Sequence, residues 1–415
     1  MKIAFFVWEF FPRMVGGLGS YAIEITKKFK ELKNDITVFT LNDGHLSTRE
    51  NWNGIDVHRP LILDTSDIFP FFITDDLKKW GQNVKLFSDI FNYNILSASK
   101  LVNQLLRKKS KKFDMLAVHD WMSSISGLSI KKEIKDFPVV FHIHSIEEQR
   151  ALGGGSQVIK DLERKMANKA DRIITVSNSM KDYLVSVGYP KNKITVCYNG
   201  CNPEKYDPSK VNKKKLEELK EKYKIKPKEN VMLFVGRLTR VKGVHNLIHS
   251  IPMVLKEFPN TKLIILGKGE EYKKLITLAQ KLNVLKKINI RSEWVSEEER
   301  ILHYALADVC IFPSINEPFG IVSLEAMAME NPVVVGAAGV VNGLKEQVIP
   351  HGKKKTGIHV NGESPENIGW GIKEVLKNLD EAKEWGKNGR KRVLKAFTWD
   401  KAAKKTLSIY KELIK

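Results

Sequence analysis

Residues 313–328 read PSINEPFGIVSLEAMA and join a turn to a helix. The Pro-Phe-Gly turn ends the preceding apolar run, and the residues that follow favour a helix that begins at about Gly320 to Ser323. The N-terminus of such a helix presents free N–H groups to a phosphate. Glu317 and Glu325, on either side of this turn, would accept hydrogen bonds from sugar hydroxyls. The stretch therefore predicts a nucleotide-sugar site; the alternative is an ordinary loop with a solvated Glu325.

Short apolar strands alternate with amphipathic helical segments along the chain. Strands are predicted at 3–7, 36–40, 115–119, 139–143, 172–176, 231–236, 262–267, 288–292, 309–314 and 332–336. Helices are predicted between them, for example at 20–32, 95–107 and 157–169. Because continuous apolar, β-branched strands are typical of sheets that are covered on both faces, the pattern indicates α/β architecture with doubly wound parallel sheets.

The length of the chain and one turn-rich segment indicate two domains. At 415 residues the chain exceeds the size at which a single core keeps growing. We expect an N-terminal domain at 1–197, a linker at 198–208 (YNGCNPEKYDP), a C-terminal domain at 209–396 and a last helix at 397–415 with Thr398 as its N-cap. Ligands of such sheets bind beyond the carboxyl ends of the strands, so two facing domains would hold a cleft between them.

The charge balance narrows the possible partners. The net charge of +21 is compatible with a nucleic acid, an anionic membrane or an anionic substrate. The lysines are spread along the chain, and no zinc-finger, RNA-binding or helix-turn-helix motif occurs, so no nucleic-acid partner is expected. The lysines at 213–228 alternate with glutamates and predict a salt-bridged surface helix. A second basic run, at 101–112, could contact anionic lipid.

The cysteines and the N-terminus bear on the location of the protein. Cys197, Cys201 and Cys310 do not make a disulfide framework, and a metal site at the first two lacks a second ligand pair, so we expect idle or buried thiols. The first predicted strand follows the first two residues directly and leaves no room for a signal peptide. No apolar run reaches membrane-spanning length. A cytoplasmic protein is expected.

The stretch E-P-F-G-x-x-x-x-E-A-M-A at 317–328 resembles the signature of retaining GT-B glycosyltransferases, especially families 4 and 5, which include glycogen and starch synthases. The resemblance covers nearly the whole chain. It implies two Rossmann-like domains that face across a cleft and a C-terminal helix that crosses back onto the first domain. It also implies no cofactor, because the nucleotide-sugar is a substrate. No D-x-D motif occurs, which argues against a metal-dependent GT-A transferase, so no bound metal is expected.

The resemblance assigns donor-binding roles around this stretch. Glu317, together with the amides of Phe319 and Gly320, would hold the sugar, and Glu325 would hold the ribose hydroxyls. The segment 291–295, which begins with Arg291, would hold the nucleotide base largely through backbone atoms.

A second basic motif follows a predicted strand in VGRLTRVKG. Arg237 and Lys242 lie across a turn from each other and can converge on one anion, because arginine offers a bidentate fork and lysine a point charge. The motif matches the diphosphate clamp of the resembling families.

The stretch WEFFPRMVGGLGSYA, which contains Gly16 and Gly17, resembles the N-terminal glycine motif of the glycogen synthase-like families, whose backbone contacts the donor diphosphate. The bacterial synthases carry a lysine two residues before the glycines; Met14 stands here instead, and Arg13 could replace that contact. The run at 17–22 also fits the G-x-G-x-x-A dinucleotide fingerprint. The long loop between the strand and the glycines disfavours that interpretation.

Histidines close two predicted strands. His142 and His144 lie on the same face of their strand and could reach the cleft, although a histidine at a strand end is often structural. The resemblance favours His144 as the residue that approaches the transferred sugar, with the T-x-H pattern of the families replaced by H-I-H. The triplet His119, Asp120 and Trp121 resembles the H-D-W of starch synthases and, with His142, would line the acceptor side.

These motifs lead to one expected function. We expect transfer of a hexosyl unit, with glucose favoured, from ADP- or UDP-glucose to an α-glucan, with His144, Arg237, Lys242 and Glu317 as the catalytic set. The alternative acceptor is a lipid or a small cell-envelope molecule, which the basic run at 101–112 would support through an anionic membrane. A nucleotide-sugar epimerase or a dinucleotide enzyme is a third possibility, and the long glycine loop counts against the dinucleotide enzyme.

Overall fold

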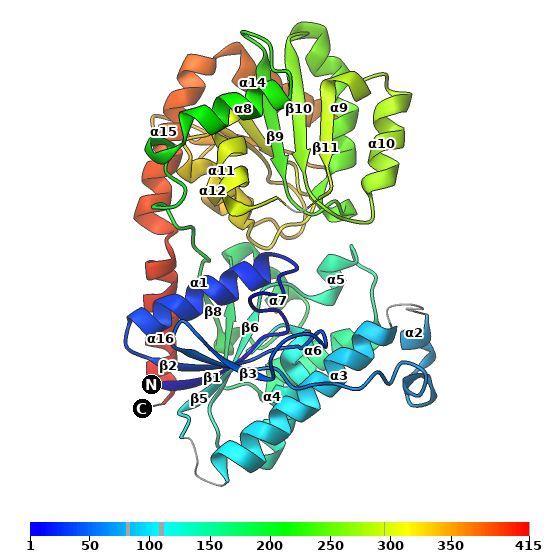
Figure 1. Ribbon diagram of the computed structural model, residues 1–415, viewed down its shortest axis with the longest axis vertical. Helices are drawn as coiled ribbons and strands as arrows, with labels where there is room; N and C mark the ends of the chain where they lie inside the picture. Colours follow the sequence, from blue (N-terminus) through cyan, green and yellow to red (C-terminus); the bar gives the residue numbers. More distant parts are fainter. Residues whose placement is uncertain (80–83, 108–111, 294, 415) are drawn as a thin grey trace. The chain divides into compact units, whose positions relative to one another are not determined.

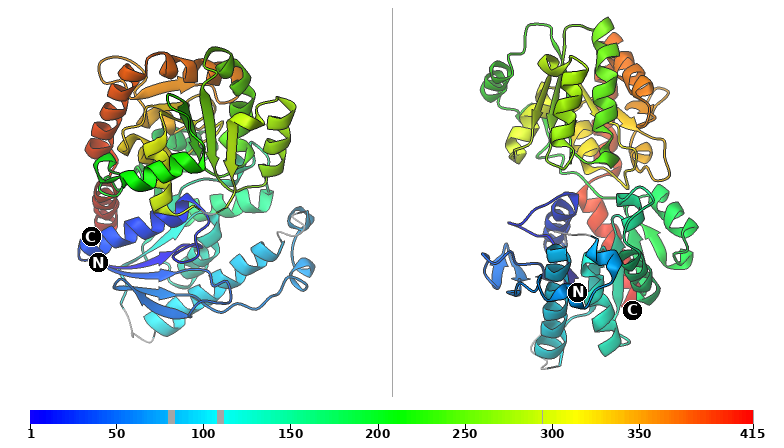
Figure 2. Two further views of the ribbon diagram at one scale, coloured as in Figure 1. Left: turned by 45° about the horizontal axis from the view of Figure 1, so that its top comes forward. Right: turned by 90° about the vertical axis from the view of Figure 1, so that its right-hand side faces the viewer.

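The computed structural model describes residues 1–79, 84–107, 112–293 and 295–414. The chain forms two compact units. One comprises Met1–Val176, Lys181–Tyr198 and Trp399–Lys415, and the other comprises Ser177–Met180 and Asn199–Thr398. Each unit is a largely parallel sheet with helices on both faces (Figures 1 and 2). The predicted α/β fold class with two Rossmann-like sheets is confirmed.

Within the described residues, the first unit contains an eight-stranded sheet in the order β3-β4-β2-β1-β5-β6-β7-β8. The strands are β1 (Lys2–Phe6), β2 (Asp35–Phe39), β3 (Arg49–Trp52), β4 (Ile55–His58), β5 (Met115–His119), β6 (Val139–Ile143), β7 (Arg172–Thr175) and β8 (Ile194–Val196). The central strands β5 and β6 are buried throughout, as their continuous apolar sequences predict. The edge strand β3, which was not predicted from the sequence, pairs antiparallel with β4 and carries polar residues.

The described helices of the first half are α1 (Gly17–Glu31), α2 (Asp75–Lys78), α3 (Val84–Ser99), α4 (Ser124–Glu133), α5 (Glu147–Arg150), α6 (Gln157–Lys169) and α7 (Asn178–Ser186). The helix predicted at 95–107 is instead the end of α3 followed by a π-helical segment, Lys100–Leu106. The N–H of Arg107 donates to the carbonyl of Val102, five residues back, at 2.9 Å. The C-terminal helix α16 (Trp399–Leu413) lies beside α1 (Figure 1).

The second unit has, in its described part, a six-stranded sheet in the order β11-β10-β9-β12-β13-β14, parallel throughout. The strands are β9 (Asn230–Val235), β10 (Thr261–Leu266), β11 (Ile288–Arg291), β12 (Val309–Phe312), β13 (Val333–Gly336) and β14 (Gly357–Val360). The helices are α8 (Lys213–Lys222), α9 (Val244–Glu257), α10 (Tyr272–Lys281), α11 (Glu297–Leu306), α12 (Ile321–Ala328), α13 (Leu344–Gln347), α14 (Pro365–Lys377) and α15 (Leu379–Ala396). Apolar side chains of β9, β10, α9 and α14 form much of the core.

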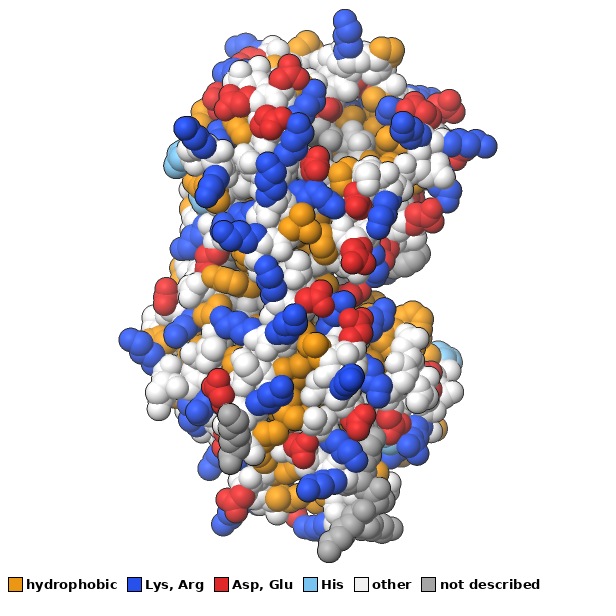
Figure 3. Space-filling model, turned by 90° about the vertical axis from the view of Figure 1, so that its left-hand side faces the viewer, with side chains coloured by type: hydrophobic (Ala, Val, Ile, Leu, Met, Phe, Trp, Pro, Cys, Tyr) orange, Lys and Arg blue, Asp and Glu red, His pale blue; other side chains and the backbone are white. Residues whose placement is uncertain are grey.

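Surface features match part of the sequence expectations. The helix predicted at 213–228 ends at Lys222, and its Lys220 and Lys215 pair with Glu217 and Glu298 at 2.8 and 2.6 Å. On the face shown in Figure 3, basic side chains are scattered among acidic ones. The three cysteines are free and buried, as expected. In the part of the chain that the structure describes, no helix combines the length and the apolar character that a membrane span requires.

Candidate active site

Many of the candidate residues follow strands at the topological switch point of each sheet, whereas Arg291 ends the edge strand β11 and the two histidines His142 and His144 lie at the end of β6. In the second unit β9 pairs with β10 on one side and with β12 on the other, so the loops after β9 and β12 diverge from adjacent strand ends. In the first unit β1 lies between β2 and β5, so the glycine loop and the end of β5 flank the equivalent point. Open α/β sheets bind ligands at such points. The topology therefore positions both sets of predicted residues for ligand binding.

Lys242 and Glu317 come from the two loops at the switch point of the second unit and form an ion pair with each other. The hydroxyl of Ser314 donates to the same carboxylate at 3.3 Å. The loops can approach because Gly243 adopts φ +68°, and a Cβ there would lie 2.1 Å from the carbonyl oxygen of Pro313. Gly243 is also the N-cap of α9, so the helix N-terminus begins directly after the lysine.

Arg237 follows β9 in the same loop and is exposed. Its guanidinium has no hydrogen-bond or ion-pair partner among residues 1–79, 84–107, 112–293 and 295–414. A bidentate donor without an internal partner is free to bind an incoming anion. The predicted clamp thus consists of one available cation and one cation, Lys242, that is paired with a carboxylate.

Glu325 lies in α12 and is buried, so the alternative of a solvated side chain is wrong. The Nε of Arg300 contacts its carboxylate at 3.2 Å, and the hydroxyl of Tyr304 donates to it at 2.9 Å. A second nitrogen of Arg300 donates to the hydroxyl of Tyr206 at 2.6 Å. Sequence reasoning missed these partners. Their only local signal is the four-residue spacing of Arg300 and Tyr304 on α11, which places both on one helix face.

The turn before α12 has the predicted form. Gly320 is the N-cap at φ +87°, and the helix starts at the next residue. The carbonyls of Phe319 and Gly320 accept hydrogen bonds from the side-chain amide of Gln347 at 2.7 and 3.3 Å. The hydroxyl of Ser323 donates to the carbonyl of Gly320 at 2.9 Å. These contacts fix the peptide planes at the start of α12 and thereby the direction of its N–H groups.

Arg291, at the end of β11, forms ion pairs with Glu293 and Glu299. Its side chain is therefore engaged within the unit. This is compatible with the expectation that segment 291–295 would act largely through its backbone. Trp294 of that segment lies outside the described residues.

An internal carboxylate shapes the glycine loop of the first unit. Glu9 accepts hydrogen bonds from the amides of Val15 and Gly16 at 2.6 and 2.9 Å. Gly17 is the first residue of α1. Arg13, the expected replacement for the missing lysine, packs its guanidinium over the ring of Trp8, 4.7 Å from the ring centroid. The loop amides thus already hold one anionic group, which shows that the loop geometry suits an anion.

The three predicted histidines form one stack in the first unit. The ring centroids of His119 and His142 lie 4.5 Å apart, and that of His144 lies 5.8 Å from His119. The Nδ1 of His119 donates to the carbonyl of Phe6 at 2.8 Å. Burial lowers the pKa of His144 to about 3 and the pKa values of the other two rings well below 6.5. All three rings are therefore neutral near pH 7.

Asp120 fixes the backbone beside this stack. Its Oδ1 accepts the amide hydrogen of His144 at 2.7 Å, and its backbone adopts φ +52°, which costs energy for a residue with a side chain. Burial raises the pKa of Asp120 to about 6, partly offset by Arg150. Trp121 is buried and stacks on Phe87 at 5.9 Å. The side chains expected on the acceptor side, His142 included, are thus buried in contacts within their own unit.

Ligand atoms of the three histidines lie within 4.8 Å of one another, a spacing that raises the question of a metal site. The rings stack with interplanar angles of 15° to 24°, so their in-plane lone pairs run side by side and do not converge. Both nitrogens of His142 also have tyrosine partners. This arrangement fits a stack of neutral imidazoles better than a tetrahedral metal site.

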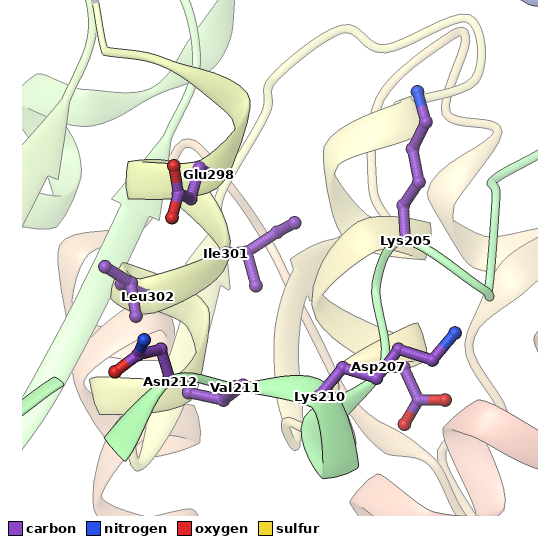
Figure 4. A pocket seen from close by; sticks show the side chains of 8 residues that line it. All are labelled: Lys205, Asp207, Lys210, Val211, Asn212, Glu298, Ile301 and Leu302. Atoms are coloured by element: carbon purple, nitrogen blue, oxygen red, sulfur yellow. The ribbon is translucent and has the colours of Figure 1, made fainter. Parts of the chain in front are cut away.

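A hollow of about 130 Å³ lies elsewhere in the second unit, between residues 205–212 and α11 (Figure 4). Lysine and carboxylate side chains form part of its wall. It shares no residue with the candidate site.

Comparison with known proteins gives the family. The family model described as Glycosyltransferase Family 4 matches residues 15–205, and the model described as Glycosyl transferases group 1 matches residues 215–392. An uncharacterized glycosyltransferase of Methanocaldococcus jannaschii is 33% identical over 415 residues, which cover 99% of this chain and 98% of that protein. The chain is a glycosyltransferase of the family 4 type.

Two further proteins are similar to this glycosyltransferase, one in sequence and one in structure. The glycogen synthase of Mycobacterium tuberculosis is 27% identical over 421 residues, covering 99% of this chain and 94% of that protein. The structure of sucrose-phosphate synthase from Thermosynechococcus elongatus has a TM-score of 0.80 at 22% identity, covering 99% of this chain and 98% of that one. The structural likeness establishes that the glycosyltransferase has the GT-B fold.

Proposed function

We propose that this glycosyltransferase is a retaining, metal-independent hexosyltransferase that moves glucose from ADP- or UDP-glucose to an α-glucan. The observation that carries the proposal is the switch point of the second unit. There an arginine with no partner among the described residues, a lysine–glutamate pair and the N-termini of α9 and α12 occupy adjacent loops. A nucleoside diphosphate sugar carries the matching groups, namely a diphosphate and hydroxyls. The similarity to glycogen synthase supports a glucan acceptor.

Each donor group has a proposed partner. Arg237 donates two parallel hydrogen bonds from its guanidinium to the diphosphate. Lys242 lies between that diphosphate and the carboxylate of Glu317 and provides a positive charge to both. Glu317 accepts hydrogen bonds from the sugar hydroxyls, and Glu325, held by its partners on α11, accepts those of the ribose. Gly16 and Gly17 contribute backbone contacts to the diphosphate, which would displace the carboxylate of Glu9 from the amide of Gly16. The segment that begins with Arg291 holds the base.

Catalysis rests on electrostatics in this proposal. The bond between the anomeric carbon and the departing phosphate oxygen breaks while the acceptor hydroxyl attacks the same face, so the configuration is retained. The acceptor proton moves to the departing phosphate, and no side-chain base is needed. Arg237, Lys242 and the helix N-termini stabilise the charge that develops on the diphosphate. His144 stabilises the positively charged sugar through its backbone carbonyl or its neutral ring.

The test is release of nucleoside diphosphate from a panel of ADP- and UDP-sugars, with and without glycogen, and with and without EDTA. The expected result is glycogen-stimulated release from one glucose donor that EDTA does not change. NMR of the extended glucan should show new α-linkages. If glycogen did not stimulate the release of nucleoside diphosphate, a glucan would be excluded as the acceptor, and the assignment as a glycosyltransferase would stand.

If the glucan is excluded, a second assay tests for a lipid acceptor. Salt-sensitive co-sedimentation with anionic vesicles would support it. The basic run at 101–112 that suggested a lipid is only partly within the described residues, because 108–111 lie outside them. A wild-type protein that releases no diphosphate from any donor would overturn the proposal.

A further inference from the structure

His142 is hydrogen-bonded at both ring nitrogens by tyrosines from two different helices. The hydroxyl of Tyr410, on α16, lies 2.6 Å from Nε2, and the hydroxyl of Tyr21, on α1, lies 3.3 Å from Nδ1. Both tyrosines and the histidine are buried. The two tyrosines, Tyr21 and Tyr410, lie 121 and 268 residues from the histidine along the chain. The arrangement therefore depends on α1 and α16 packing together on the sheet.

The hydrogen bonds select one tautomer of His142. Each phenol has a single proton to donate, and hydrogen bonds donated by an O–H group are on average shorter than those donated by an N–H group. We therefore assign the short contact to Tyr410 as a bond from the phenol to a bare Nε2. The longer contact at Nδ1 is then a bond from the ring N–H to the oxygen of Tyr21. His119 has its proton on Nδ1 as well, because the carbonyl of Phe6 can only accept.

Tyr21 connects His142 to His144. The ring of Tyr21 meets the ring of His144 edge-on, with centroids 4.4 Å apart and an interplanar angle of 60°. The Nε2 of His144 is buried and has no hydrogen-bond partner in the described part of the chain. Packing against Tyr21 and His119 is therefore a main constraint on the orientation of this ring, while Asp120 fixes its backbone.

We propose that His142 is a positioning residue, which Tyr410 and Tyr21 hold as the Nδ1–H tautomer so that Tyr21 and His119 present the ring of His144 in one orientation. The inference rests on the proposed function, because it takes His144 to act at the transferred sugar. His142 itself is buried, so we expect it to act through Tyr21 and His144 and not by contact with the substrate. Its substitution should therefore lower the rate of transfer and leave donor binding unchanged.

Three substitutions of His142 separate its two hydrogen bonds. His142→Gln can keep a partner for Tyr410, His142→Asn can keep one for Tyr21, and His142→Leu removes both. We expect His142→Leu to lower kcat about 10- to 100-fold with the donor KM within about twofold, because misplacement of a catalytic group costs rate. His142→Gln and His142→Asn should each recover part of that loss. Tyr410→Phe, which removes one hydroxyl and keeps the packing, serves if His142→Leu fails to fold.

A spectroscopic measurement tests the arrangement without turnover. Proton–nitrogen correlation spectra of the full chain labelled with ¹⁵N-histidine report the tautomer of each ring, and the signals missing in His142→Gln identify His142. We expect an Nδ1–H tautomer that changes or becomes mixed in Tyr410→Phe. An Nε2–H tautomer in the wild type would overturn the assignment.

The kinetic results keep the two proposals apart. An unchanged kcat per folded molecule in His142→Leu, or in Tyr410→Phe if the former does not fold, would show a purely structural role and overturn the positioning role alone. No turnover by the wild type with any donor would overturn the proposed function and the positioning role with it. Loss of kcat with recovery in the two amide variants would support both.

Discussion

The two switch points of this enzyme hold their key side chains by opposite means. In the second unit two candidate carboxylates are paired with cations: Lys242 pairs with Glu317, and Arg300 pairs with Glu325. In the first unit the three candidate histidines are neutral, because burial lowers their pKa values, and they are held by stacking and by hydrogen bonds to neutral groups. The site of the second unit uses paired charges, and the histidine stack of the first unit carries none near pH 7.

The difference follows from the charge that each site is proposed to meet. A diphosphate is an anion, and a cation balanced by a carboxylate can bind it by rearranging existing contacts. The transferred sugar becomes positive as its bond to phosphate breaks, and a protonated imidazole beside it would oppose that charge. A ring such as that of His144, with a pKa of about 3, presents no such charge near pH 7.

The largest effect should come from breaking the charged pair. Lys242→Ala should lower kcat/KM about 100- to 1000-fold, because a donor to the departing diphosphate is lost. It should also lower the free energy of unfolding by about 3 kcal/mol, because Glu317 is left as an unpaired, largely buried carboxylate. Chemical denaturation and diphosphate release measure the two effects.

The double variant Lys242→Ala with Glu317→Ala is the matched control. It removes the unpaired charge, so it should regain part of the stability that Lys242→Ala loses, with no regain of activity. If activity returned together with stability, the lysine would be a structural residue and the contrast between the two sites would lose its charged half.

Substitution of Arg237 tests the charged site without a loss of stability. Arg237→Ala should lower kcat/KM about 10- to 100-fold, as expected for one charge-assisted bond to the donor. Its free energy of unfolding should change by less than about 0.5 kcal/mol, because the side chain is exposed. Arg240→Ala is the control, since Arg240 is an exposed arginine of the same turn. Equal losses in the two variants would indicate general attraction of an anion and no specific clamp.

The sequence predicted the parts of these sites that depend on local pattern. All ten named strands are present, and α12 starts where the Pro-Phe-Gly turn ends. The pairing of Glu325 with Arg300 and Tyr304 was not predicted, because it requires α11 and α12 to pack together, and residue spacing carries no information on that. The hydrogen bonds from the loop amides to Glu9 and between the two tyrosines and His142 were not predicted either, because residue spacing carries no information on such contacts. The edge strand β3 was not predicted because its polar sequence, RENW, lacks the apolar pattern.

Asp120 tests whether the first unit excludes charge. Its pKa in the folded protein, about 6, lies above the ordinary 3.8, so the folded state binds the proton more tightly than the unfolded state. Stability from this group is therefore present at low pH and is lost as the pH rises from about 4 to about 6, by about 3 kcal/mol. Asp120→Asn cannot ionise and keeps an acceptor for the amide of His144. Relative to the wild type, its free energy of unfolding should rise by up to that amount across the window.

Denaturation of both proteins at several pH values measures this difference. The comparison cancels most of the contribution of Glu163, whose pKa burial raises to about 7 and which is present in both proteins. A difference that stays constant between pH 4 and pH 7 would show that Asp120 carries its charge at no cost and that burial in this unit does not exclude charge.

The smallest effect is expected at Tyr304, where the charged site depends on a neutral donor. Tyr304→Phe removes one of the hydrogen bonds to Glu325 and should lower the free energy of unfolding by about 1 kcal/mol. If Glu325 holds the ribose, the donor KM should rise about two- to fivefold with kcat unchanged, because the ribose is bound equally before and during the transfer. Tyr93→Phe is the control, since its buried hydroxyl, in the first unit, donates to the carbonyl of Phe39 at 2.9 Å. It should match the loss of stability and leave KM unchanged. A fall in kcat for Tyr304→Phe would instead place Glu325 among the groups that act on the reacting bond, and ribose binding alone would no longer describe its role.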